Sequence, residues 1–253
     1  MKRVRAPAEP ERFRAWREEN PAATWAQFKD ACRGPGGVAN ELFEALAGAQ
    51  RGLCAYCEIE LQPPLGAEVE HFYPKSKSTA DHNWGLDFGN LLAGCEGGQR
   101  PRELPDRTGQ PLKENLHCGA SKKDLDLTAI ILDPRQVPLT PSLWIVDDSG
   151  ELTVDARACV AGGIDPERAA QTLARLGLNA PVLKRLRKAV RVRLKRDHAE
   201  AWDGTDDDEL AAWHRVAEQT MPLIADRLPF WTTVRDQLGL AAERDLADHP
   251  PDW

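Results

Sequence analysis

The chain has 253 residues, a length that suits one large domain or two small ones. Hydrophobic residues make up 42% and charged residues 29%, so the composition supports a buried core and excludes a globally disordered protein. The net charge of -7 excludes a uniformly basic nucleic-acid-binding protein, although it leaves room for a local basic patch. No apolar run reaches the ~18 residues of a membrane span, and no apolar signal segment follows the basic N-terminal residues. We therefore expect a cytoplasmic protein with reduced cysteines, in which grouped cysteines indicate a metal site before a disulfide.

Residues 1–51 form the first predicted region. Their aromatic and aliphatic residues recur at helical spacing, and the breaks at Pro21 and at residues 34–37 predict three short helices. Residues 52–127 form the second region, which is rich in glycine and proline and lacks long periodic stretches. This region therefore needs a stabilising element other than a large apolar core.

Residues 128–160 form the third region, which we predict as strand. Residues 128–132 are a short apolar run, and residues 142–146 and 151–154 flank a turn-forming sequence at 147–150, as in a β-hairpin. Residues 161–253 form a C-terminal helical region. Asp165 and Pro166 predict the start of its first helix, Pro181 opens a second that runs to about residue 202, and residues 206–209 begin a third.

Charge is distributed unevenly over the C-terminal helical region. Residues 184–196 contain eight basic residues and no acidic one, whereas the chain after residue 200 is acidic. The basic stretch is either a solvated helix face or a surface that contacts phosphates or a partner protein.

Four cysteines of the second region suggest a structural zinc site. Cys54 and Cys57 have the CxxC spacing with which two thiolates bind one zinc ion from a tight turn, and Cys95 and Cys118 supply a second pair. A redox CxxC motif would need a βαβ context, which the helical segment before Cys54 does not provide. The alternative is a pair of buried thiols beside an incidental CxxC.

Between the two cysteine pairs lies an acid–histidine dipeptide, Glu70-His71, followed by Pro74 and Lys75. In this order of residues, the sequence resembles the HNH endonuclease family. The resemblance is strongest to the HNH subunit of Septu-type and retron-linked anti-phage defence systems. The resemblance covers most of residues 1–190. The matching segments are residues 50–58, 70–76, Trp84, residues 90–92, Cys95, residues 117–119, Lys122, residues 132–134, 148–150 and 176–179.

The resemblance implies an α+β, mainly helical protein: a zinc-stabilised ββα-metal HNH core at residues 52–127 with N- and C-terminal helical extensions. It implies that His71 is the general base, that Glu70 binds a catalytic Mg²⁺ or Mn²⁺, and that Asn90 ties the loop that aims His71. Many family members carry a further metal ligand after the last cysteine, where Gly119 and Ala120 offer none. His117, Asp87 and Asp124 remain open as that ligand. The candidate phosphate contacts are Lys75, Lys77, Lys122 and Lys123.

The predicted function is metal-dependent hydrolysis of nucleic-acid phosphodiesters, with DNA favoured over RNA. The resemblance also implies a role as effector nuclease in an anti-phage defence complex with an ATPase subunit. The alternative is a zinc-stabilised nucleic-acid-binding or adaptor subunit that does not cleave, and the missing ligand at Gly119 and Ala120 favours it.

Overall fold

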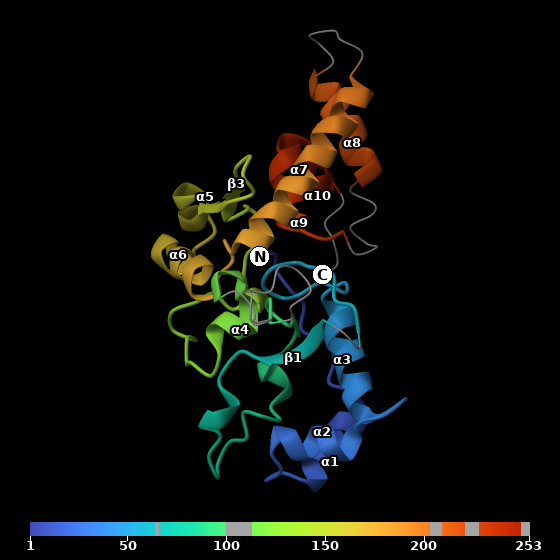
Figure 1. Cartoon of the computed structure of the whole chain (residues 1–253), viewed down its shortest axis with the longest axis vertical. Coiled ribbons are helices and arrows are strands. Elements are labelled where there is room, and N and C mark those ends of the chain that lie inside the picture. The colour runs from blue at the N-terminus through green and yellow to red at the C-terminus, as the bar shows by residue number, and fades with distance from the viewer. Residues whose placement is uncertain (64–65, 100–112, 203–208, 221–227, 249–253) are drawn as a thin grey trace.

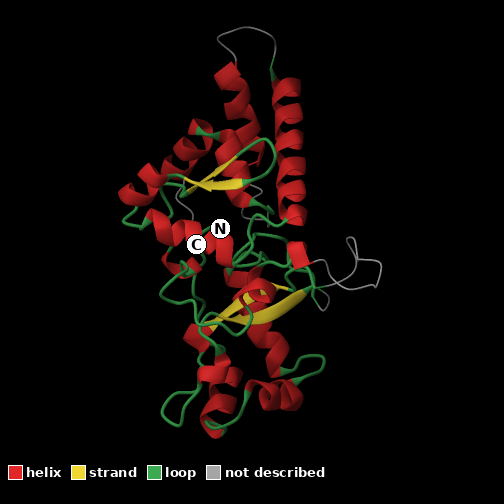
Figure 2. Cartoon of the chain, turned by 60° about the vertical axis from the view of Figure 1, so that its left-hand side comes forward, coloured by secondary structure: helices red, strands yellow, loops and turns green. Residues whose placement is uncertain are grey.

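The computed structural model describes residues 1–63, 66–99, 113–202, 209–220 and 228–248. The molecule is elongated, with the N-terminal helices at one end and the longest helix reaching toward the other (Figure 1). Two small antiparallel sheets lie apart from each other, one near the middle and one among the C-terminal helices (Figure 2). Within the described residues, no helix combines the length and apolar content that crossing a bilayer requires.

The three helices predicted at the N-terminus are present as α1 (Glu11–Glu19), α2 (Trp25–Cys32) and α3 (Val38–Ala49). Thr24 caps α2 in a capping box with Gln27, as the sequence order Thr-x-x-Gln favours. Phe13 and Phe28 are completely buried, and their rings meet edge to face at 5.2 Å. These aromatic contacts join α1 to α2 and form one end of the main hydrophobic core.

The middle of the chain is a strand–strand–helix unit. Strand β1 (Ala67–His71) pairs antiparallel with β2 (Leu91–Cys95), so that His71 lies opposite Leu91 and Ala67 opposite Cys95. The short helix α4 (Cys118–Lys122) packs on β2. Among the described residues of this unit, three single-turn helices lie in the connections: η1 (Lys75–Lys77), η2 (Phe88–Asn90) and η4 (Lys113–Asn115).

The predicted hairpin consists of β3 (Trp144–Val146) and β4 (Leu152–Val154), whose turn is closed by hydrogen bonds to the Asp147 side chain. The predicted strand at residues 128–132 is wrong. That segment is a series of turns, because Asp126 accepts hydrogen bonds from the backbone and hydroxyl of Thr128 and the chain then bends back to Leu127. The region also contains helices that the sequence did not predict, η5 (Pro134–Gln136) and α5 (Ala156–Ala161).

The C-terminal helices begin where the sequence predicted. Asp165 caps α6 (Pro166–Arg175) and Pro166 occupies its first position, while α7 (Pro181–Ala201) starts at Pro181. Helix α8 (Glu209–Thr220) is described from residue 209 onward, so the predicted start near residue 206 lies outside the described residues. Helices α9 (Trp231–Leu238) and α10 (Leu240–Asp248) complete a second hydrophobic cluster with α7 and α8.

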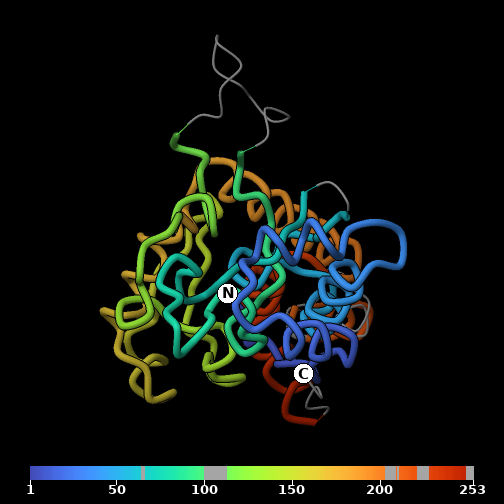
Figure 3. Tube along the Cα trace, turned by 90° about the horizontal axis from the view of Figure 1, so that it is seen from below, coloured from blue at the N-terminus to red at the C-terminus, as the bar shows by residue number. Residues whose placement is uncertain are grey.

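The N-terminal segment lies near the centre of the molecule, as both the side view and the view along the long axis show (Figures 1 and 3). The ammonium group of Met1 is buried and lies 3.2 Å from the carboxylate of Glu58. The same carboxylate accepts hydrogen bonds from the backbone and hydroxyl of Thr232 at the start of α9. Glu58 therefore connects the chain start, the segment after Cys57 and the C-terminal helices.

Candidate metal centre and adjoining cleft

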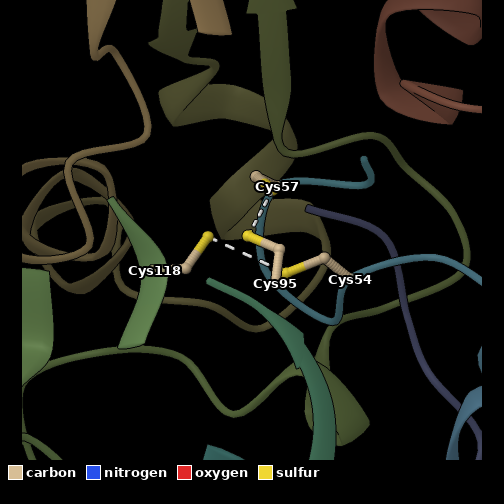
Figure 4. Close-up of side chains that lie close together, drawn as sticks. All are labelled: Cys54, Cys57, Cys95 and Cys118. Atoms are coloured by element: carbon tan, nitrogen blue, oxygen red, sulfur yellow. Dashed lines mark hydrogen bonds between the residues drawn. The ribbon is translucent and has the colours of Figure 1, made fainter. Parts of the chain in front are cut away.

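The four predicted cysteine ligands lie together in the interior. Cys54 and Cys57 come from the segment after α3, Cys95 ends β2 and Cys118 begins α4, and their side chains converge (Figure 4). The four sulfur atoms all lie within 4.8 Å of one another, with 3.8 Å between Cys54 and Cys118 and 3.6 Å between Cys57 and Cys95. Sulfur atoms bound tetrahedrally at about 2.3 Å from zinc lie about 3.8 Å apart. The cluster can therefore hold a metal ion such as zinc.

The chemistry around the cysteines fits a buried tetrathiolate site. Burial, together with hydrogen bonds among the thiols, raises the pKa of Cys118 well above its usual value, so a metal must release protons when it binds. His117 contacts Cys57 through its ring and donates from Nδ1 to the carbonyl of Asn115 at 2.8 Å. Its side chain is thus engaged at the cysteine cluster rather than in the adjoining cleft.

A large open cleft of about 1610 Å³ adjoins the cysteine cluster. One wall consists of the end of α1, the start of α2 and the loop between them, and the other consists of β1, the loop after it and α4. Asn83 holds the two walls together, because its amide donates to the carbonyls of Pro21 and Ala23 at 2.9 Å. The N-terminal helices therefore form part of the cleft that contains Glu70 and His71.

His71 ends β1 and is oriented by two contacts. Its Nε2 donates to the carbonyl of Gly85 at 3.1 Å, and its ring meets Trp25 edge to face at 4.8 Å. A carbonyl oxygen only accepts, so the proton of the neutral ring resides on Nε2 and the lone pair on Nδ1. Burial lowers the pKa of His71 to about 4, and nearby lysines act in the same direction. The imidazole is therefore neutral at physiological pH.

Glu70 is buried beside α4 and is held through one of its oxygens. Its Oε1 lies 3.0 Å from the ammonium of Lys122 and accepts from the hydroxyl of Tyr56 at 3.4 Å. The same ammonium donates to the carbonyl of His71 at 2.9 Å. Burial raises the pKa of Glu70, and Lys122 opposes that rise. Lys122 thus fixes both the Glu70 carboxylate and the backbone of His71.

Asn90 is buried at the end of η2 and spans the loop after β1. Its amide donates to the carbonyls of Tyr73 at 2.9 Å and of Trp84 at 2.8 Å, while its oxygen accepts from the backbone of Tyr73 at 2.6 Å. These bonds tie the two ends of the loop that carries Gly85, the hydrogen-bond partner of His71. The structure therefore brings Glu70, His71 and Asn90 into one connected arrangement.

The four candidate lysines occupy different environments. Lys75 and Lys123 are exposed and line the cleft, whereas Lys77 is exposed and lies outside the cleft lining. Lys122 is only 2% exposed and its ammonium is engaged by Glu70. Its burial separates it from the other three, which present their charges to solvent.

A protein of Escherichia coli named "Retron Ec83 putative HNH endonuclease" is 33% identical to this chain over 189 residues, which make up 68% of the chain and 69% of that protein. This chain belongs to the HNH endonuclease family. No family model matches it, and no solved structure matches it. The family assignment therefore rests on the sequence relative. The positions of Glu70 and His71 at the cleft come from the structure of this chain.

In this HNH-family chain, sequence reasoning missed three residues of the site: Trp25, Tyr56 and Glu68. Glu68 lies two residues before Glu70, so strand alternation places both carboxylates on one face of β1. The alternation of side chains along a strand could therefore have predicted Glu68 as a neighbour of Glu70. Trp25 and Tyr56 reach His71 and Glu70 from distant parts of the chain, and no local sequence pattern indicates those contacts.

Proposed function

We propose that the chain is a metal-dependent nuclease that hydrolyses phosphodiester bonds, in DNA rather than RNA, with His71 as its general base. The observation that supports this most directly is the hydrogen bond from His71 Nε2 to Gly85, which leaves Nδ1 as the proton acceptor of a residue that lines the cleft. The family membership supports the same reaction.

In the proposed reaction, neutral His71 accepts a proton from the attacking water through Nδ1. The carbonyl of Gly85 then stabilises the imidazolium by accepting from Nε2, and Trp25 restricts the orientation of the ring. Asn90 maintains the loop that positions Gly85. Lys75 and Lys123, exposed on the cleft wall, contact backbone phosphates and so position the nucleic acid without reading its sequence.

The carboxylate of Glu70 fits the binding of Mg²⁺ or Mn²⁺, which prefer oxygen ligands. Its Oε2 makes no hydrogen bond to the described residues, since Lys122 and Tyr56 both contact Oε1. A divalent cation held by Glu70 would supply Lewis-acid stabilisation of the charge on the phosphate and on the leaving oxygen. The four cysteines would hold zinc separately in a structural role, because all four are buried and none of them lines the cleft.

The deciding experiment compares His71→Ala with the wild type in a plasmid-nicking assay containing Mg²⁺ or Mn²⁺. We expect a loss of about 10²–10⁴-fold in rate, the usual contribution of a general base, with unchanged zinc content and melting temperature. His214→Ala is the matched control, because that histidine contacts Arg244 away from the cleft.

Equal cleavage by the wild type and by His71→Ala would contradict the proposed base. Absence of cleavage by the wild type on DNA and on RNA, with nucleic-acid binding retained, would support the adaptor alternative instead. Running both nucleic acids in parallel also tests the preference for DNA.

We further propose that the nuclease acts in the cytoplasm as the effector of a Septu-type or retron-linked defence complex that includes an ATPase subunit. The relative's association with a retron supports the defence context. Helix α7 presents exposed basic residues and Trp202 is 42% exposed at its end, so this helix offers a surface for a partner. Trp231, a second tryptophan of the C-terminal helices, is buried within the second cluster and so is not accessible to a partner. Co-purification with the ATPase, compared between the wild type and Trp202→Ala, tests this surface.

A further inference from the structure

The HNH sequence pattern left the second protein ligand of the divalent cation unassigned, and the structure now separates the candidates. His117 is engaged by Asn115 and Cys57 at the cysteine cluster. Asp87 accepts from His82 through Oδ2 at 2.8 Å and caps Gly89 through Oδ1 at 2.9 Å. Asp124 is exposed and lines the cleft. The side chains of His117 and Asp87 are thus engaged elsewhere, and Asp124 is the alternative to a ligand from β1.

The free oxygen of Glu70 lies over Gly119, the first residue after Cys118. A Cβ atom on Gly119 would stand 2.6 Å from Glu70 Oε2, closer than real Cβ contacts allow. The same Cβ position is 3.5 Å from Glu68 Oε1. Two carboxylate oxygens from neighbouring same-face positions of β1 therefore border one small space, and that space exists because residue 119 has no side chain.

We propose that Glu68 is the second protein ligand of the divalent cation at Glu70, and that Gly119 provides the space in which the two carboxylates meet. This inference rests on the proposed metal-dependent nuclease function. In this arrangement β1 supplies both carboxylates, and the helix position after the last cysteine supplies room instead of a ligand.

The two carboxylates are prepared for the cation in different ways. Glu70 is buried and held on its Oε1 side by Lys122 and Tyr56, so its Oε2 has a fixed direction. Glu68 is exposed, lines the cleft and makes no hydrogen bond or ion pair with the described residues. It can therefore rotate about its own side-chain bonds to complete a coordination shell. One fixed and one adjustable carboxylate suit Mg²⁺ and Mn²⁺, which otherwise keep several waters.

Charge balance favours the same assignment. Glu68 and Glu70 place two like charges beside one space, and Glu96 adds a third nearby. Lys122 pairs with Glu70, and the exposed Lys75 acts on both carboxylates from a greater distance. A divalent cation bound by Glu68 Oε1 and Glu70 Oε2 would compensate the remaining negative charge of the carboxylates. The positive charge left on the cation would then face the phosphate. The ammonium of Lys122 stays on Oε1 throughout, so the cation and the lysine do not compete for the same oxygen.

The test measures Mn²⁺ binding by isothermal titration to the full-length, zinc-loaded protein. We expect Glu68→Gln to weaken Mn²⁺ binding at least about ten-fold, because cation affinity follows the number of charged ligands. Glu68→Asp, which keeps the charge, should retain more of the affinity than Glu68→Gln. Asp124→Asn is the matched control, since it removes an acid from the same cleft, and should change the affinity less than about two-fold. Zinc content and melting temperature verify that each variant is folded.

Mn²⁺ binding by Glu68→Gln at wild-type affinity, with binding lost in Glu70→Gln, would overturn the role of Glu68 and leave the proposed nuclease function standing. Absence of Mn²⁺ binding to the wild type would overturn both this ligand and the metal part of that function. Weakened binding in Glu68→Gln, together with wild-type cleavage by His71→Ala, would support the ligand while contradicting the proposed base.

Discussion

At the scale of single residues, Gly119 shows how a missing side chain determines what a site can hold. The added methyl group of Gly119→Ala would press on Glu70 Oε2 at 2.6 Å and on its Cδ at 3.3 Å. We expect Glu70 to move, with about ten-fold or greater loss of Mn²⁺ affinity and a similar loss of cleavage. Gly48→Ala in α3 is the control, because nothing lies within 4 Å of its added Cβ.

The control substitution should also stabilise α3 by about 0.5–1 kcal/mol, because alanine loses less backbone entropy than glycine in a helix. Titration calorimetry and thermal unfolding of both variants measure the two effects. Unchanged Mn²⁺ affinity in Gly119→Ala would mean that Glu70 does not bind the cation through Oε2.

At the scale of elements, the cysteine cluster joins three pieces of chain: the segment after α3, the end of β2 and the start of α4. The buried arginine Arg187 of α7 donates to the carbonyls of Gly150 and Leu178, and its charge acts favourably on Cys57 and Cys118. A zinc ion with four thiolates carries a net negative charge, so a buried cation nearby stabilises it. The metal site is therefore connected to the hairpin and to the C-terminal helices as well as to β2 and α4.

We predict that Cys57→Ser removes the zinc and unfolds residues 52–127. Structural zinc binding contributes about 10–16 kcal/mol in small zinc domains, as much as the whole free energy of unfolding of a typical domain. Limited proteolysis and metal analysis should show cleavage in this region and less than one zinc per chain. Cys159→Ala, a buried cysteine outside the cluster, should retain zinc. A soluble, zinc-free and protease-resistant Cys57→Ser protein would disprove a structural role for the metal.

At the scale of the whole molecule, Glu58 connects regions that are far apart in the sequence. Burial opposes the charge of Glu58, yet the Met1 ammonium and the hydrogen bonds from Thr232 lower its pKa overall. The segment after the cysteine knuckle is thereby joined to α9, which itself packs on β3. Deleting the C-terminal helices would expose the Glu58 carboxylate and the buried face of α7. The proposed partner surface on α7 is therefore better tested by single substitutions such as Trp202→Ala.

We predict that Glu58→Gln lowers the free energy of unfolding by about 2–3 kcal/mol, because it removes a buried charge that compensates a buried ammonium. Glu60→Gln is the matched control, since that side chain is exposed two residues further on, and should change stability by less than about 0.5 kcal/mol. Chemical denaturation of the zinc-loaded proteins measures both values. Equal stability of the two variants would show that Glu58 does not join the regions energetically.

The sequence by itself determined most of the local elements and the grouping of the four cysteines. Asp165 and Pro166 start α6, and the turn at residues 147–150 closes the β3–β4 hairpin, because caps and turns depend on hydrogen bonds between residues only a few positions apart. The four cysteines could be grouped from their spacing, since a CxxC pair followed by a second pair of cysteines is typical of a structural zinc site.

The tertiary structure decided which side chains meet in the cleft. The sequence treated Lys122 as an exposed phosphate contact, but folding buries its stem and pairs its ammonium with Glu70. Folding also packs Trp25 against His71, and residues 128–132 form turns instead of the predicted strand. These outcomes depend on partners tens of residues away, and the free energy that selects them comes from burial and charge compensation, which local sequence patterns do not encode.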